Sequence, residues 1–121
     1  MSKEIINELN SGTVHITEDV IISIATVETN NVEGVYEIPI NMVERLSNRY
    51  MNKDVEVNID DQNVYITIKT AIEDGRDLIL IGESIQEKVR DKIESMTGLN
   101  VMEVNVVVTN VVIPKEPKES N

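Results

Sequence analysis

The stretch at residues 85–108 constrains the fold of this chain more than any other part of the sequence. From Leu78 to Met96, apolar residues recur every three or four positions, as on one face of an amphipathic helix. This stripe consists of Leu78, Ile81, Ile85, Val89, Ile93 and Met96. Asp77 is a suitable N-cap, and Gly98 stands where a left-handed residue usually ends a helix. The spacing therefore predicts one long helix between Asp77 and Gly98.

Alternating apolar and polar residues predict strands on both sides of this helix. Residues 55–59 and 64–72 alternate on either side of a polar turn, which is typical of an antiparallel hairpin. The last strand is expected at about residues 100–113. One of its faces carries Met102, Val104, Val106, Val108 and Val112, and the other face is mixed and carries Val107 and Val111. Because a strand, a helix and a strand in succession favour a right-handed crossover, we expect the second hairpin strand and the last strand to be parallel.

Shorter elements are expected nearer the N-terminus. Residues 13–16 predict a strand, and Thr17 can cap a helix that follows it. The apolar residues of this helix at helical spacing are Val20, Ile24 and Val27, with Ile21 and Ala25 beside them. Residues 34–38 predict a short strand, and residues 41–51 predict a short helix.

Together these elements predict a single α+β domain over residues 13–113. We expect two layers, with a mixed sheet of about four to five strands and two or three helices packed on one face. Residues 1–12 are expected to form a flexible lead with at most a weak helical turn. Residues 114–121 are charged and contain proline, and they predict a disordered tail.

The composition disfavours several classes of function. A formal net charge of -11 disfavours binding to nucleic acids and to anionic lipid surfaces, because proteins that bind these carry basic patches. The chain has no cysteine, which excludes disulfides, thiolate nucleophiles and cysteine metal ligands. Its start lacks the apolar core of a signal peptide, and no apolar run is long enough to cross a bilayer. We therefore expect a cytoplasmic protein without direct insertion into a membrane.

No catalytic residue, cofactor-binding residue or metal ligand is predicted. His15 is the one histidine, and on the polar side of a short strand we expect it to be an ordinary surface residue. The acidic pairs at residues 60–61 and 73–74 fall in turns, where aspartate accepts local backbone hydrogen bonds. The sequence contains neither a glycine-rich phosphate loop nor a nucleophile elbow. These residues predict no enzymatic activity.

Apolar residues outside the expected core are the candidates for protein contacts. Ile79 and Leu80 lie off the apolar stripe, in the first turn of the long helix. Either a wide buried face includes them, or they form an exposed patch that meets a partner or a second copy. The outer face of the last strand is a second candidate contact surface, because it carries the apolar residues Val107, Val111 and Ile113. Such a surface suits self-association or pairing at the sheet edge.

Three blocks of the sequence resemble the alkaline shock protein family, which includes the Gls-type general stress proteins of Gram-positive bacteria. The blocks are VHITEDVIISIATVETNNVEGV, VEVNID and IQEKVRDKIESMTGLNVMEVNVVV, and the likeness covers about residues 13–113. Its most specific part is the C-terminal block, with Gln86, Val89, the helix stop MTGL at residues 96–99, and Val104-Asn105. Asp74 stands where relatives usually have tyrosine, and residues 79–80 stand where they often have Pro-Glu, so the chain resembles a divergent member.

The resemblance implies a non-enzymatic cytoplasmic protein linked to cell-envelope stress. Some relatives are tethered beneath the membrane by a small membrane-anchored partner protein, and others are linked to fatty-acid metabolism. Our leading hypothesis is a non-catalytic scaffold or regulatory protein that acts through protein–protein contacts and self-association as a homo-oligomer. The second is a small-ligand or divalent-metal binding domain, enzymatic or regulating lipid metabolism. It would use the acidic loops at Asp60-Asp61 and Glu73-Asp74-Asp77.

Overall fold

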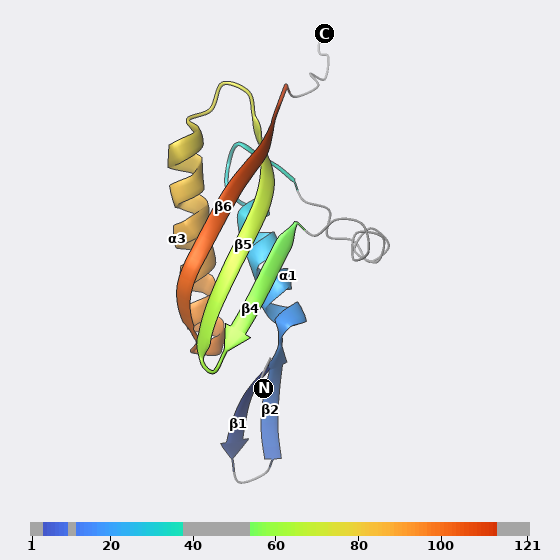
Figure 1. Cartoon of the computed structure of the whole chain (residues 1–121), viewed down its shortest axis with the longest axis vertical. Helices are drawn as coiled ribbons and strands as arrows, with labels where there is room; N and C mark the ends of the chain where they lie inside the picture. Colours follow the sequence, from blue (N-terminus) through green and yellow to red (C-terminus); the bar gives the residue numbers. More distant parts are fainter. Residues whose placement is uncertain (1–3, 10–11, 38–53, 114–121) are drawn as a thin grey trace.

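A computed structural model describes residues 4–9, 12–37 and 54–113 of the chain. These residues form two layers, a four-stranded sheet and two helices that cover one of its faces (Figure 1). The predicted α+β class is confirmed. The short helix expected at residues 41–51 and the tail expected at residues 114–121 lie outside the described residues.

Strand β5 (Asn63–Glu73) is the centre of the main sheet. Strand β4 (Val55–Asp60) pairs with its first half in antiparallel register, as the predicted hairpin requires, and strand β3 (Val35–Tyr36) pairs antiparallel with its last residues. Strand β6 (Asn100–Val112) runs parallel to β5 along its whole length. The expected parallel pairing across the long helix is therefore confirmed.

Helix α3 (Leu78–Thr97) is the long helix that the apolar stripe predicts. Asp77 is its N-cap, and Gly98 ends it with a φ of 77°, a left-handed conformation that glycine adopts without strain. The buried residues of the stripe are Ile81, Ile85, Val89 and Ile93. The predicted burial of this stripe is wrong at its two ends, because Leu78 is 38% exposed and Met96 is 61% exposed. Only the middle of the helix lies over the sheet core.

Helix α1 (Glu18–Asn30) buries a different face from the expected one. Ile21, Ala25 and Thr29 are buried, whereas Val20 and Val27 are each 43% exposed. The buried residues are four positions apart, so they share one side of the helix. Two apolar stripes lie next to each other on α1, and packing against β4 and α3 determines which one is covered.

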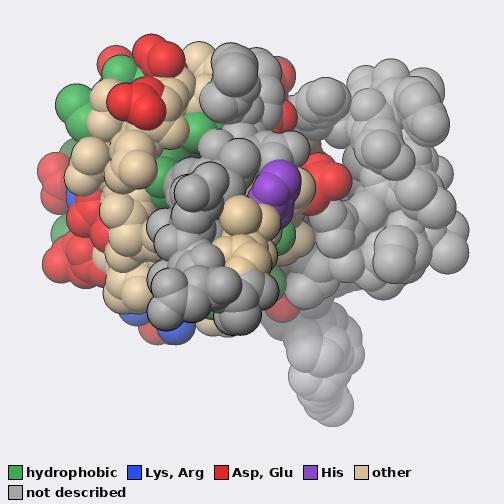
Figure 2. Space-filling model, turned by 90° about the horizontal axis from the view of Figure 1, so that it is seen from below, with side chains coloured by type: hydrophobic (Ala, Val, Ile, Leu, Met, Phe, Trp, Pro, Cys, Tyr) green, Lys and Arg blue, Asp and Glu red, His purple; other side chains and the backbone are tan. Residues whose placement is uncertain are grey.

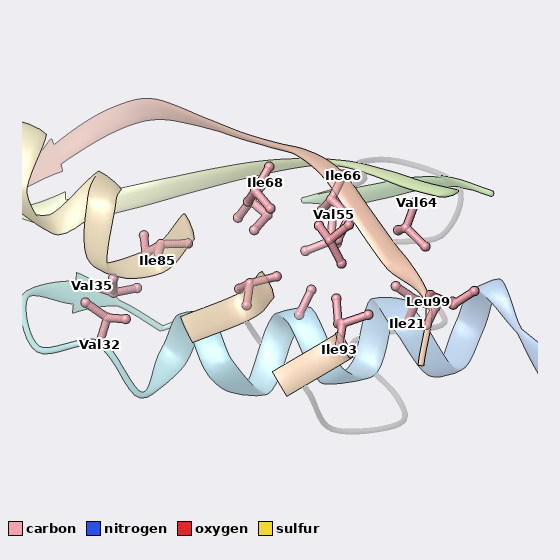
Figure 3. Packing of buried hydrophobic residues seen from close by; sticks show 14 of the residues in the cluster. Ile21, Val32, Val35, Val55, Val64, Ile66, Ile68, Ile85, Ile93 and Leu99 are labelled. Carbon is pink, nitrogen blue, oxygen red and sulfur yellow. The ribbon is translucent and has the colours of Figure 1, made fainter. Parts of the chain in front are cut away.

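The core lies between the sheet and the two helices (Figure 3). Ile66 and Ile68 of β5 point toward the helices, and Ile21 of α1 with Ile85 and Ile93 of α3 fill the space below them. Each of these side chains is at most 1% exposed. Burial of one such side chain stabilises the fold by about 1.5–3 kcal/mol. Branched aliphatic residues supply this packing in a chain without phenylalanine or tryptophan.

Strand β6 contains two bulges. Val64 pairs with Val101 and Tyr65 with Glu103, so Met102 is an extra residue on β6. Thr109 is a second extra residue, because the partners of Thr70 and Ala71 are residues 108 and 110. Each extra residue moves the following side chains to the opposite face of the sheet.

The bulges correct the predicted faces of β6. Met102 is 52% exposed, so it does not share the buried face of Val104 as expected. Val111 pairs with Ile72, whose side chain is buried on the helix-covered face. Val111 therefore lies on that inner face and not on the outer face with Val107.

A hairpin precedes α1. Strand β1 (Glu4–Leu9) pairs antiparallel with strand β2 (Gly12–Thr17) in a separate two-stranded sheet. The weak helical turn expected within residues 1–12 is therefore wrong, because β2 supplies hydrogen-bond partners that a lone segment lacks. The strand expected at residues 13–16 is confirmed within β2. Thr17 occupies the N-cap position of α1, but its side chain makes no capping hydrogen bond.

Candidate protein-interaction surface

The first turn of α3 has a fixed position. The Asp77 carboxylate accepts a hydrogen bond from the Leu80 backbone N–H at 3.1 Å, which satisfies one of the donors that a helix start leaves unpaired. The adjacent Arg76 guanidinium lies 3.3 Å from the Glu73 carboxylate and 3.6 Å from the Glu33 carboxylate. These contacts connect the start of α3 to the end of β5 and to the loop after α1.

Three apolar side chains of this turn are exposed to solvent. Ile79 is 73% exposed and Leu80 is 60% exposed. Leu78 is partly exposed as well, and the buried stripe begins only at Ile81. The alternative that a wide buried face includes Ile79 and Leu80 is therefore wrong.

The end of β6 brings further apolar residues to the same end of the molecule (Figure 1). Val112 pairs with Glu73, and its carbonyl accepts a hydrogen bond of 2.8 Å from the Asp74 N–H, in the loop that leads into α3. Val111 is 50% exposed and Ile113 is 79% exposed. We call the following residues the apical patch: Leu78, Ile79, Leu80, Val111 and Ile113.

Val107, the remaining predicted contact residue, does not belong to the apical patch. It pairs with Lys69 on the outer face of the sheet, away from the helices, and is 42% exposed. Four residues of strand separate it from Val111, or about 13 Å. The structure therefore places the start of α3, with Ile79 and Leu80, and the end of β6, with Val111, at the same end of the molecule. Val107 lies on a separate surface.

The acidic loops lie too far apart to form one site. Asp60 and Asp61 precede β5 and Asp74 follows it, so the 11 residues of the strand, about 35 Å, separate the loops. Each loop also has a structural role. Asp61 adopts a left-handed φ of 61° in the tight turn between β4 and β5, and Asp77 caps α3. Within the described residues, no group of three or more His, Asp or Glu side chains could hold a metal ion.

His15 and Asp54 are two further polar residues that do not belong to the apical patch. His15 is exposed on β2 and is visible on the face shown in Figure 2. Asp54, at the start of β4, has a pKa raised above the ordinary value by burial, and the nearby Lys69 charge lowers this pKa by a smaller amount. No helix in the described ranges is long and apolar enough to cross a membrane.

Two sequence comparisons identify relatives of the chain. A family model for the alkaline shock protein 23 family, described as having a cell envelope-related function, matches residues 6–113. The uncharacterized protein YqhY of Bacillus subtilis (strain 168) is 28% identical over 112 residues, which cover 89% of this chain and 83% of that protein.

Solved structures of the MamM CTD have a similar fold. A variant in a zinc form matches with a TM-score of 0.56 at 13% identity, over 86% of this chain and 97% of the other. A variant in a copper form matches with a TM-score of 0.55 at 11% identity, over 78% of this chain and 99% of the other. At such low identity the likeness supports the fold alone.

Proposed function

Because the chain belongs to the alkaline shock protein 23 family, whose function is related to the cell envelope, we propose that it is a non-catalytic scaffold or regulatory protein of the cytoplasm that serves envelope homeostasis. It acts through contacts with other proteins and with further copies of itself. The apical patch is the observation that carries this proposal. Exposed apolar side chains gathered at one end of a small protein are typical of an interaction site.

The surroundings of the apical patch indicate the chemistry of the partner. Among the described residues, Glu33, Glu73 and Asp74 lie beside the start of α3, and the neighbouring Arg76 already contacts two of these carboxylates. A complementary partner presents apolar side chains with lysine or arginine next to them. The cytoplasmic flanks of membrane-anchored proteins are rich in these basic residues.

We therefore favour a small membrane-anchored protein as the partner. A net charge of -11 repels this chain from an anionic lipid surface. A basic juxtamembrane segment bound at the apical patch overcomes that repulsion locally and holds the chain close to the membrane. Localisation at the envelope then depends on the partner and not on lipid binding by the chain itself.

Affinity capture from the native host tests this function. The tagged chain is isolated from cytosolic and membrane fractions separately, as wild type and as the double variant Ile79→Asp with Leu80→Asp. We expect wild type to retain an integral-membrane protein with a basic cytoplasmic flank, and we expect the double variant to lose it. The substituted side chains are exposed, so the fold should persist.

A matched control separates loss of the patch from addition of charge. Val20→Asp with Met96→Asp adds the same two charges at helix positions that are 43% and 61% exposed, in the first turn of α1 and the last turn of α3. This control should retain the membrane partner as wild type does. Equal capture by all three forms, or capture of soluble enzymes alone, contradicts the proposed function.

A further inference from the structure

The first half of the free edge of β6 is covered by side chains of α3. Among the described residues, β6 pairs with β5 alone, so its other edge has no strand partner. On this edge the Val101 N–H donates to Glu94 Oε2 at 2.9 Å, and the Val101 carbonyl accepts from Arg90 Nε at 3.5 Å. The Val104 carbonyl accepts from Gln86 Nε2 at 3.0 Å. These side chains satisfy backbone groups that a neighbouring strand would otherwise bind.

The series of covering side chains stops at the middle of β6. Glu94, Arg90 and Gln86 follow one another at intervals of four residues, so they share one side of α3. The next position at this interval is Gly82, which has no side chain. A Cβ atom added to Gly82 would meet nothing within 4 Å. Packing within the chain therefore does not require a glycine there, although glycine disfavours a helix relative to alanine.

The second half of β6 presents backbone groups to this open space. Val101 and Val104 direct backbone groups away from β5, whereas the Val112 carbonyl bonds to the Asp74 N–H at the end of β5. In a strand segment without a bulge, the N–H and C=O groups of successive residues point alternately to one neighbouring strand and to the other. The N–H and C=O groups of Val106 and Val108 therefore also point away from β5. Figure 1 shows β6 diverging from α3 toward its C-terminal end.

The same segment carries no charge. Residues 105–113 contain only valine, asparagine, threonine and isoleucine, in a chain whose net charge is -11. Natural edge strands are usually protected from pairing by charged residues. The opposite edge strand, β4, has such protection in Glu56 and Asp60. An uncharged surface lets a second copy of this acidic chain approach without local like-charge repulsion, and residues 105–113 provide one.

We infer that residues 105–109 of two copies pair as antiparallel strands about a two-fold axis at Val107. This register sets Val106 of one copy opposite Val108 of the other, so that their outward N–H and C=O groups bond to each other. Beyond the paired segment, Glu103 falls opposite Val111, so no charged residue faces another. The inference rests on the proposed function only in that self-association is part of it, because the apical patch itself takes no part in the strand pairing.

A cysteine at the two-fold axis tests the register directly, because the chain has no cysteine of its own. At this position Val107 faces its own copy in a non-hydrogen-bonded pair, with Cα atoms about 4.5 Å apart. That separation permits a disulfide. We expect purified Val107→Cys to form covalent dimers under mild oxidation. In Asn110→Cys, the same pairing leaves the two cysteines about 20 Å apart, so this control should stay monomeric on a denaturing gel.

A second control tests whether another edge explains the cross-link. Asn58→Cys places an exposed thiol on β4, at the opposite edge of the sheet, and it should also stay monomeric. Cross-linking of Val107→Cys no faster than Asn58→Cys, or a wild-type monomer at all concentrations in analytical ultracentrifugation, overturns the inference. If the monomeric chain still captures its membrane partner, the strand pairing alone is refuted and the proposed function stands.

Substitutions at Gly82 provide an independent test. Gly82→Ala and Gly82→Leu should both raise the melting temperature of the monomer, because each replaces a helical glycine by a better helix former. Only the leucine extends into the space beside the β6 edge. We expect Gly82→Leu to weaken dimerisation by about tenfold or more, and Gly82→Ala to leave it within about twofold. Equal dimerisation of both variants contradicts the proposed role of this open space.

Discussion

Replacing Gly34 by alanine should destabilise the fold at the point where the loop after α1 meets α3. Gly34 has a φ of +98°, which costs an L side chain about 1 kcal/mol. A Cβ atom there would lie 2.7 Å from Ile81 Cδ1. Since Ile81 is only 7% exposed, its side chain has to repack, at a further cost of about 1–2 kcal/mol. We expect urea denaturation to give an unfolding free energy lower by about 2–3 kcal/mol.

Two further variants separate the backbone cost from the clash. Gly75 also has a positive φ, of +90°, but an added Cβ meets nothing within 4 Å, so Gly75→Ala should cost only about 1 kcal/mol. Ile81→Val deletes the clashing Cδ1 atom. In the Gly34→Ala background it should be less destabilising than in wild type, with a coupling energy of about 1 kcal/mol. Equal losses for the two glycine variants, with no coupling to Ile81, would refute the packing argument.

Two other predictions concern carboxylates. Asp77→Ala removes the α3 cap and should lower the unfolding free energy in urea by about 1 kcal/mol, whereas Asp74→Ala should change it by less than about 0.5 kcal/mol. Equal losses for both would mean that the cap bond contributes nothing. Burial raises the pKa of Asp54, so its charged form disfavours the folded state at neutral pH. Asp54→Asn should therefore be more stable than wild type at pH 7, and this gain should disappear below pH 3.8; a gain independent of pH contradicts it.

Elements with strong local signals were predictable from the sequence. The long helix is bounded by an aspartate cap and by Gly98, and each acts on residues within one helical turn. The hairpin of β4 and β5 follows from alternation on both sides of the turn at Asp60 and Asp61. The parallel placement of β6 follows from the order of strand, helix and strand. None of these inferences requires knowledge of distant contacts.

The face that an element buries was less predictable, because it depends on tertiary packing. Val20 and Val27 have the same helical periodicity as Ile21 and Ala25, and only docking on the sheet distinguishes the two stripes. The segment 100–112 reads as one regular strand, although bulges at two positions reverse its faces. The residues at a bulge have the same strand propensity as their neighbours, so the pattern of valines in this segment does not indicate where the bulges lie.

The candidate surface was predicted in part. The sequence identifies Ile79, Leu80 and Val111 as apolar residues outside the expected stripe, but their exposure depends on where the core ends beneath α3. Leu78 was missed because its spacing matches the buried stripe. The covering of the β6 edge by Gln86, Arg90 and Glu94 was missed as well, since these residues resemble an ordinary solvated helix face.

Complementation of a strain that lacks this gene tests most directly whether the chain functions through the apical patch. The strain receives wild type, the variant Ile79→Asp with Leu80→Asp, or the variant Asp60→Asn with Asp61→Asn, and growth is measured under envelope stress at matched protein levels. We predict that wild type and the acidic-loop variant restore growth and that the patch variant does not. Full rescue by the patch variant, with loss of rescue by the acidic-loop variant, would contradict this account and favour a ligand at the loop.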